Sequence, residues 1–460
     1  MFVKFLPPSI RKYFQMSKPE RQYELRLTLW RTPLLYIIAT FLFAAITLYL
    51  DVGIGLALYM PDFFKAEFET TRLLISSLIG GVLTLSAFTL NSLLVVLTTF
   101  SGQFSPRLLQ NFVKDKQTQH ILGVFNGSFV YVLIMFLFIS SKPVDYFSAV
   151  PFVTVLIAFI TAIVFIYFIN HATSWMQVHN ITDMMKDVSE GIINGAFSQE
   201  LEDLRREEPG NLLDIDYPQS ETVISPKSGY IQLILFKDLI KEARKDNIVI
   251  KIEVRVGSFV LNGNQLFTYW GPGAKNVDES KYVELIRIGH KETEIQDLKF
   301  GLNKLGEIAI KAMGNDDPKT ASNTIFQVTD LLLTLDEKMT FSPYLVDENN
   351  QVRLILEVDN FEYHLYQGLG VIRHYAQKNY PIITDIIAAL TRLAGAADKK
   401  HHDVIWGFAS NTIDHIYTEF IFDIDRRLLL RNLHKLANIT NNIEHYQYIE
   451  EHFKGKAQNE

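Results

Sequence analysis

The sequence predicts a membrane α-helical protein with four transmembrane helices, followed by a cytoplasmic α+β region that has a small β-barrel or sandwich and a helical C-terminal part. Three observations predict this fold class. Four long apolar segments lie before residue 170, the rest of the chain has no comparable run, and short β-rich runs begin at Glu221. A hydrocarbon core about 30 Å thick takes roughly 20 helical residues. Because backbone groups in lipid must bond within their own segment, each apolar segment is predicted to be a helix.

The four predicted spans lie in a domain of residues 33–192, after a cytoplasmic N-terminal segment, residues 1–32. They cover about residues 33–50, 73–100, 121–139 and 149–169. The fourth helix is expected to extend beyond the membrane, because apolar residues stay interleaved with polar residues as far as Val188.

Basic residues flank the spans unequally. Ten of them precede the first span or lie between the second and third: Lys4, Arg11, Lys12, Lys18, Arg21, Arg26, Arg31, Arg107, Lys114 and Lys116. The other side has only Lys65, Arg72 and Lys142. The positive-inside rule therefore predicts that the N- and C-termini are both cytoplasmic.

The charge of the chain is also divided unevenly. Residues 1–192 hold 14 basic and 11 acidic groups, and residues 193–460 hold 30 basic and 40 acidic groups, a net charge of −10. A nucleic-acid partner would need a basic face, so none is expected. The chain has no cysteine, which excludes structural zinc sites built on cysteine.

The region after the spans divides into three predicted parts. Residues 193–220 are acidic and polar with two prolines, as is typical of a linker. Residues 221–272 alternate apolar and polar positions in short runs, which predicts a small β-rich domain. Residues 273–460 are predicted to be mainly helical, with Asp317 as the cap of a helix whose first residue is Pro318.

Four segments together resemble a bacterial family of predicted membrane proteins, the domain of unknown function numbered twenty-two fifty-four. The segments are residues 101–109 (SGQFSPRLL), 228–232 (SGYIQ), 296–302 (QDLKFGL) and 316–321 (DDPKTA). Where the family tends to show Arg-Pro-Gly-Asp-Phe-Val, this chain has RVGSFV at residues 255–260, and it has Asp316 where Asn is commoner. The resemblance covers nearly the whole chain and implies a multi-pass protein of the bacterial cytoplasmic membrane, but no mechanism.

The signatures of catalysis are missing from the sequence. No Gly-rich loop precedes a Lys-Ser/Thr pair, no Gly-x-Ser-x-Gly elbow occurs, and the 12 histidines are scattered. We therefore expect no enzymatic activity, no catalytic residue, no cofactor and no metal site.

The second span carries a stripe of polar and small residues. At about 100° per residue, one helix face is formed by Ser77, Gly81, Thr84, Phe88, Asn91, Val95 and Thr98. The stripe continues to Gln103 and Arg107, which are expected at the cytoplasmic mouth. Small residues and hydroxyls suit helix–helix packing, and they also suit the lining of a pore or transporter, so these alternatives stay open.

The pore interpretation is the more specific one, since Asn91 is costly in lipid unless it is hydrogen-bonded or wet. One stripe per chain requires a homo-oligomeric ring, here of about four to six copies with five favoured. No carboxylate lies in the span, so inorganic anions, chloride in particular, are the expected ions. The alternative is a membrane-anchored structural or sensory protein whose cytoplasmic domain binds a partner or ligand.

Overall fold

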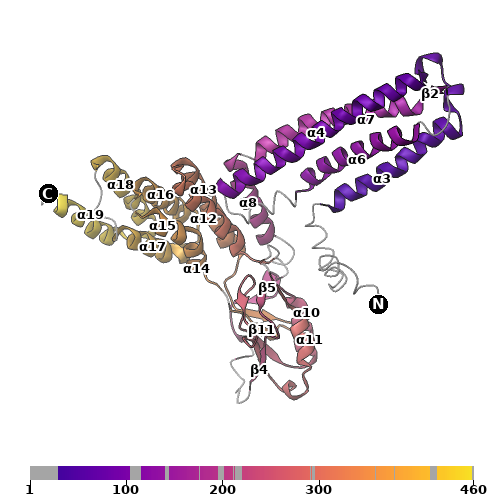
Figure 1. The fold of residues 1–460 in the computed structure, drawn as a ribbon. Coiled ribbons are helices and arrows are strands. Elements are labelled where there is room, and N and C mark those ends of the chain that lie inside the picture. The colour runs from indigo at the N-terminus through magenta and orange to yellow at the C-terminus, as the bar shows by residue number, and fades with distance from the viewer. Residues whose placement is uncertain are drawn as a thin grey trace. The chain divides into compact units, whose positions relative to one another are not determined.

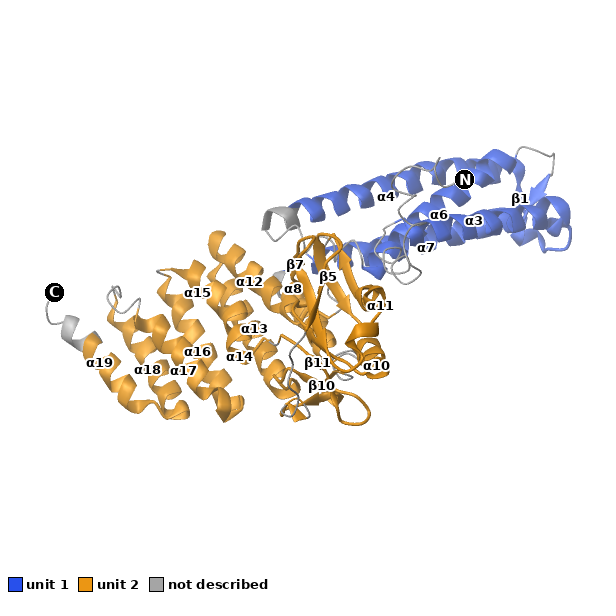
Figure 2. Cartoon of the chain, turned by 90° about the horizontal axis from the view of Figure 1, so that it is seen from below, with its two compact units in different colours: residues 1–178 blue, residues 179–460 orange. Residues whose placement is uncertain are grey.

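The computed structural model describes residues 30–103, 115–139, 145–175, 177–194, 201–210, 212, 220–290, 292, 296–357, 359–377, 379–414 and 422–457. The chain forms two compact units (Figure 2), which we call the membrane unit, Met1–Val178, and the C-terminal unit, His179–Glu460.

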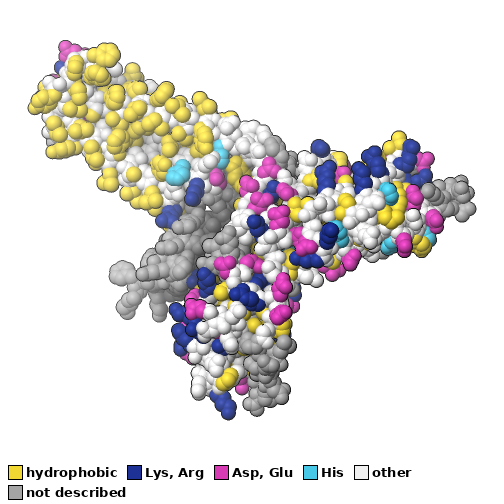
Figure 3. Space-filling model, turned by 180° about the vertical axis from the view of Figure 1, so that it is seen from behind, with side chains coloured by type: hydrophobic (Ala, Val, Ile, Leu, Met, Phe, Trp, Pro, Cys, Tyr) yellow, Lys and Arg dark blue, Asp and Glu magenta, His cyan; other side chains and the backbone are white. Residues whose placement is uncertain are grey.

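Four long helices make up the membrane unit (Figure 1): α3 (Arg31–Leu48), α4 (Phe68–Gln103), α6 (Lys116–Phe138) and α7 (Ala149–Trp175). Each of these helices is long and apolar enough to cross a membrane. The predicted fold class with four apolar helices is therefore confirmed. Hydrophobic side chains cover the visible face of this unit (Figure 3), as a lipid-facing surface requires.

Helix α6 is the centre of the membrane unit. It contacts α3, α4 and α7. In an apolar stretch of 18 residues, 50% of the residues of α6 are buried, against 11–17% for the other three helices. Two glycines bring α3 close. A Cβ atom at Gly123 would lie 2.5 Å from the ring of Tyr36, and one at Gly127 would lie 2.8 Å from the hydroxyl of Thr40. Small residues thus allow tight packing of these helices.

A buried carboxylate joins the end of α3 to the start of α7. Asp51, 1% exposed, lies in the π-helical turn Tyr49–Gly53 that follows α3. Its oxygens accept hydrogen bonds from the backbone N–H groups of Ser148, Ala149 and Val150 at 2.7–3.2 Å. An anion at this position satisfies free N–H groups and interacts favourably with the dipole of α7.

The β-rich part of the C-terminal unit consists of two open sheets, and the described strands form no closed barrel. A six-stranded sheet has the order β3-β10-β11-β6-β8-β4, and a three-stranded sheet has the order β7-β5-β9. The strands are β3 (Arg205–Arg206), β4 (Glu221–Ile224), β5 (Gly229–Ile234), β6 (Val249–Ile252), β7 (Phe259–Val260), β8 (Gln265–Trp270), β9 (Ile286–Gly289), β10 (Tyr344–Val346) and β11 (Val352–Ile355). One hydrophobic core, which includes Ile231, Ile250 and Phe267, is shared by residues of both sheets.

The six-stranded sheet extends beyond residues 221–272, where the sequence located the β-rich domain. Strand β3 comes from the expected linker, and β10 and β11 come from the expected helical part. Central to this difference is the parallel pairing of β11 with β6, which sets Leu354 opposite Ile250. Pairing between strands about 100 residues apart leaves no local pattern in the sequence.

Helices account for most of the remaining C-terminal unit. They are α8 (Val178–Ile193), α10 (Phe236–Lys245), α11 (Glu279–Glu284), α12 (Lys299–Gly314), α13 (Pro318–Lys338), α14 (Phe361–Leu365), α15 (Val371–Ala376), α16 (Tyr380–Ala396), α17 (His402–Asp414), α18 (Asp423–Thr440) and α19 (Ile443–Ala457). The cap at the start of α13 is confirmed, since the Asp317 carboxylate accepts a hydrogen bond from the Thr320 N–H at 3.1 Å.

One helix differs from the sequence expectation. The expected extension of the fourth span is a separate helix, α8, held on α13 by a hydrogen bond from Gln327 to Asp183 and an ion pair of Lys186 with Asp330.

Helix α19 forms at the polar end of the chain. Tyr446 and Ile449 of this helix are buried. A narrow apolar side therefore anchors α19, although most of its residues are polar.

Candidate functional site

The stripe predicted on the second span lies on an exposed side of α4 within the single chain. Ser77, Gly81, Thr84, Phe88, Asn91, Val95 and Thr98 are all exposed. The buried side of α4 is formed instead by Ile75, Val82, Thr89 and Val96, which recur every seven residues and contact α6 and α7. Within one chain, therefore, the stripe is not the packing face of α4.

Gly81 of the stripe and the adjacent Gly80 have no close neighbour among the described residues. A Cβ atom added at Gly80 or Gly81 would meet nothing within 4 Å. By contrast, Gly123 and Gly127 of α6 make room for a neighbouring helix. The space beside Gly80 and Gly81 is therefore free for another chain, for lipid or for water.

The polar groups of the stripe differ in how they are satisfied. The hydroxyls of Thr84 and Thr98 donate to backbone carbonyls of α4, at 2.8 Å to Gly80 and 2.9 Å to Val95. Hydroxyls bonded in this way are tolerated in lipid. The Asn91 amide has no hydrogen-bond partner among the described residues, and it is the group whose surroundings decide the role of the stripe.

Phe88 lies at the edge of the stripe nearest α7. Phe88 is 50% exposed, and its ring makes an edge-on contact with Phe165 of α7, with ring centroids 5.6 Å apart. Part of the ring is thus held by the chain itself and part faces outward. Of the two residues expected at the mouth, Gln103 ends α4, and Arg107 lies outside the described residues.

A third exposed side of α4 is rich in leucine. Leu83, Leu90 and Leu94 are each about half exposed or more, and at about 100° per residue they lie roughly a third of a turn from the stripe. Leucine is a natural lipid-facing residue. Helix α4 therefore has a buried side, a leucine side and a polar side.

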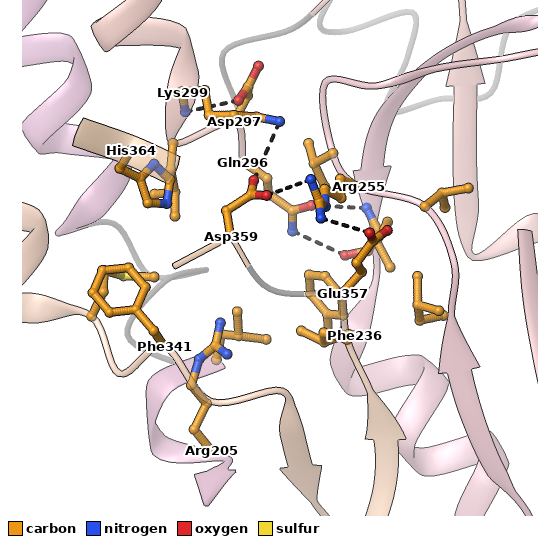
Figure 4. A pocket seen from close by; sticks show the side chains of 18 of the residues that line it. Arg205, Phe236, Arg255, Gln296, Asp297, Lys299, Phe341, Glu357, Asp359 and His364 are labelled. Carbon is orange, nitrogen blue, oxygen red and sulfur yellow. Dashed lines mark hydrogen bonds and ion pairs between the residues drawn. The ribbon is translucent and has the colours of Figure 1, made fainter. Parts of the chain in front are cut away.

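The C-terminal unit contains a second candidate site, a cavity of about 140 Å³ between the sheets and α12–α14. Figure 4 shows His364 and Phe341 on one side of it, and Arg255, Glu357 and Phe236 on the other. Most of the cavity wall is apolar, including Val254, Met339 and Leu356. A concave, mainly apolar space with a few converging polar groups is the usual form of a small-ligand site.

The basic groups beside the cavity are paired with carboxylates. Arg255 pairs with Glu357 and with Asp359, each at 2.7 Å. Lys299 lies 3.5 Å from Asp359, and Arg205 pairs with Glu202 at 2.7 Å. Each basic group thus has an acidic partner.

Two buried groups beside the cavity titrate unusually. Burial raises the pKa of Asp297 to about 6, although the nearby Lys299 acts in the opposite direction. Burial also lowers the pKa of His364 to about 4, so its imidazole is neutral at pH 7. Neither ring nitrogen of His364 has a hydrogen-bond partner among the described residues, and Nδ1 is sealed from water.

The segment before α12 is anchored to both of its neighbours. The Gln296 side chain accepts from the Ile234 N–H at 2.9 Å and donates to the Ile234 carbonyl at 3.1 Å. The Asp297 carboxylate accepts from the Lys299 N–H at 3.0 Å and lies against Gly257, whose φ is +82°. These contacts fix one wall of the cavity.

The sequence did not single out this cavity. One signal was present, because one of the four segments on which the family resemblance rests, residues 296–302, contributes Gln296, Asp297, Leu298 and Lys299 to the wall. The RVGSFV segment also contributes Arg255 and Val256 to the wall. Among the described residues no group of three or more His, Asp or Glu could hold a metal ion.

Four membrane-crossing helices joined to a larger unit with its own cores define a multi-pass membrane protein. The chain belongs to the DUF2254 family of predicted membrane proteins, whose model matches residues 26–392. The family resemblance found in the sequence is thereby confirmed.

The relatives of the chain include uncharacterized proteins of Mycobacterium tuberculosis and Mycobacterium bovis. Each is 24% identical over 345 residues, which are 72% of this chain and 65% of the relative. The chain thus covers less than two thirds of the length of these relatives. No solved structure matches the chain.

Proposed function

We propose that the chain is one subunit of a homo-oligomeric ion channel in the bacterial cytoplasmic membrane, with the polar side of α4 lining the pore. The observation that carries the proposal is that this side, from Ser77 to Thr98, is exposed in the single chain while another side of α4 does the packing. An amide without a hydrogen-bond partner costs free energy in hydrocarbon, and Asn91 has no such partner among the described residues. Assembly of several copies around an axis would place the Asn91 amide next to water in the pore or next to a neighbouring chain.

The composition of the span supports a preference for anions. Residues 73–100 contain neither acidic nor basic residues, so no ring of carboxylates would attract cations. Hydroxyls, the amide of Asn91 and the positive edge of the Phe88 ring can face an anion such as chloride. We propose a ring of about five copies, since each chain offers one stripe.

Orientation and chemistry complete the proposal. The excess of basic residues before α3 and between α4 and α6 favours a cytoplasmic location for both termini. The absence of catalytic motifs from the sequence favours a protein without enzymatic activity, with the bilayer, inorganic anions and further copies of the chain as its partners.

Conductance of the purified protein in planar bilayers tests the pore. Asn91→Leu is expected to lower the conductance several-fold, because it removes a group that replaces part of the ion's hydration. Leu90→Ala, on the leucine side, is the matched control and is expected to leave it unchanged. Reversal potentials in a salt gradient are expected to follow chloride. Protein that carries no current would contradict the channel function.

A second candidate function is a membrane-anchored structural or sensory protein. The cavity in the C-terminal unit favours this function. Its wall is mainly apolar and includes the buried imidazole of His364, which has no hydrogen-bond partner among the described residues. Under this function the four helices are an anchor, and the recognition takes place in the C-terminal unit.

A further inference from the structure

We propose that the cavity of the C-terminal unit binds a small uncharged molecule of single-ring size, with one polar group hydrogen-bonded to His364. This inference names the ligand class for the second candidate function and does not depend on conduction through α4.

The size of the cavity limits the ligand. Its volume is about 140 Å³, close to that of an engineered apolar cavity of about 150 Å³ that holds benzene. A nucleotide or a lipid tail is too large to be enclosed in this space. The apolar wall, which includes Val254, Leu298 and Met339, suits a ring or a compact branched body.

The charges around the cavity exclude most ionic ligands. Arg255, Lys299 and Arg205 already pair with carboxylates. An anion would have to displace one of these carboxylates. A cation would have to compete with Lys299, whose charge also interacts favourably with the nearby Asp297 carboxyl. Breaking a buried or half-buried ion pair leaves a charge without its partner, which is strongly destabilising. An uncharged ligand avoids this cost.

His364 provides the polar recognition. His364 is 3% exposed, and a buried polar group without a hydrogen bond costs free energy. Neutral imidazole has one donor and one acceptor nitrogen. Because Nδ1 is sealed from water, Nε2 is the nitrogen that a hydroxyl or an amide of the ligand would satisfy. The rings of Phe341 and His364, with centroids 5.9 Å apart, offer a flat ligand an aromatic surface.

Binding of small probes to the full chain in detergent tests the proposal. Benzamide and phenol are the uncharged probes, and benzoate, benzylammonium and phenyl phosphate are the charged probes of similar shape. Thermal shifts and ligand-observed NMR are expected to show at least tenfold tighter binding of an uncharged probe than of any charged probe. Equal or tighter binding of a charged probe, or no binding of the uncharged probes at millimolar concentration, overturns the proposal.

Variants then locate the site. Val254→Phe fills the cavity without changing charge and is expected to abolish binding of the uncharged probe, while Ile224→Phe on exposed β4 preserves it. His364→Phe is expected to weaken binding at least tenfold, and His374→Phe, at an exposed position of α15, is its control. If Val254→Phe does not fold, Leu356→Phe takes its place. Unchanged binding to the filled variant overturns the location, whatever α4 conducts.

Discussion

A Cβ atom at Gly257 would lie 2.3 Å from Oδ2 of Asp297. The loop after β6 therefore contacts the segment before α12, with the backbone of Gly257 packed against the buried carboxylate of Asp297. Gly257 also has a φ of +82°, which residues with a side chain rarely adopt.

Gly257→Ala is expected to destabilise the C-terminal unit by more than the backbone strain of about 1–3 kcal/mol alone, because its methyl group displaces the Asp297 carboxylate. Gly263→Ala is the matched control: Gly263 has a φ of +88°, but an added Cβ would meet nothing within 4 Å. Thermal unfolding of both variants measures the difference. Equal losses of stability in the two variants would show that the contact of Gly257 with Asp297 does not add to the destabilisation.

The pH dependence of stability is expected to contain two opposing contributions. The pKa of Asp297 is raised from 3.8 to about 6, so the stability that its protonation gives the folded state is fully present below pH 3.8 and is lost as the pH rises to 6. The pKa of His364 is lowered from 6.5 to about 4, so the stability of the folded state that depends on its neutral form is present above pH 6.5 and is lost as the pH falls to 4. The two nearly cancel between these values.

Single substitutions separate the two contributions. In Asp297→Asn only His364 titrates, so the melting temperature is expected to fall more steeply than in the parent protein between pH 6.5 and 4. In His364→Phe only Asp297 titrates, and stability is expected to rise over the same acidification. Each change amounts to about 3 kcal/mol at most, since one pKa unit corresponds to about 1.36 kcal/mol. Parallel pH profiles in all three proteins would contradict both pKa shifts.

Asp51→Ala is expected to destabilise the membrane unit by about 1–3 kcal/mol, because it leaves the N–H groups at the start of α7 without an acceptor. Asp51→Asn keeps one acceptor oxygen and is expected to lose less. Denaturant titration in mixed detergent micelles measures both losses. Asp62→Ala removes an exposed carboxylate that pairs only with Lys65 among the described residues, and it serves as the neutral control.

Cross-linking tests which side of α4 meets another chain. Since the protein has no cysteine, Ser77→Cys and Leu83→Cys each introduce the only thiol. Oxidation in membranes is expected to give a covalent dimer through position 77 and none through position 83. The opposite result would assign the subunit interface to the leucine side.

Phe88→Ala is expected to increase current or hold the pore open, because a ring of aromatic side chains forms an apolar constriction that gates by losing water. The substitution also removes the contact with Phe165. Phe165→Ala removes the same contact and leaves the Phe88 ring in place, so it separates the two effects in single-channel recordings. Identical currents in both variants would assign the effect to packing against α7.

The sequence predicted the four spans of the membrane unit, because a span is a local property of about 20 residues. The fixed periodicity of a helix also predicted the polar stripe, but it did not predict that Ile75 and Val82 would occupy the packing side of α4. The cavity of the C-terminal unit could not be predicted from local sequence. Arg255 and Glu357 are separated by 102 positions, and only the pairing of β11 with β6 brings their segments together.

The Gln296 amide has a consequence for how one strand of the C-terminal unit ends. Strand β7 covers only Gly229 and Tyr230 of β5, and Ile234 lies further along the same strand. Gln296 bonds to both the N–H and the carbonyl of Ile234 and so acts there as a one-residue strand. Ile234 is 1% exposed, and buried backbone groups without a partner cost free energy. A single side-chain amide thereby takes the place of a neighbouring strand at the end of β5.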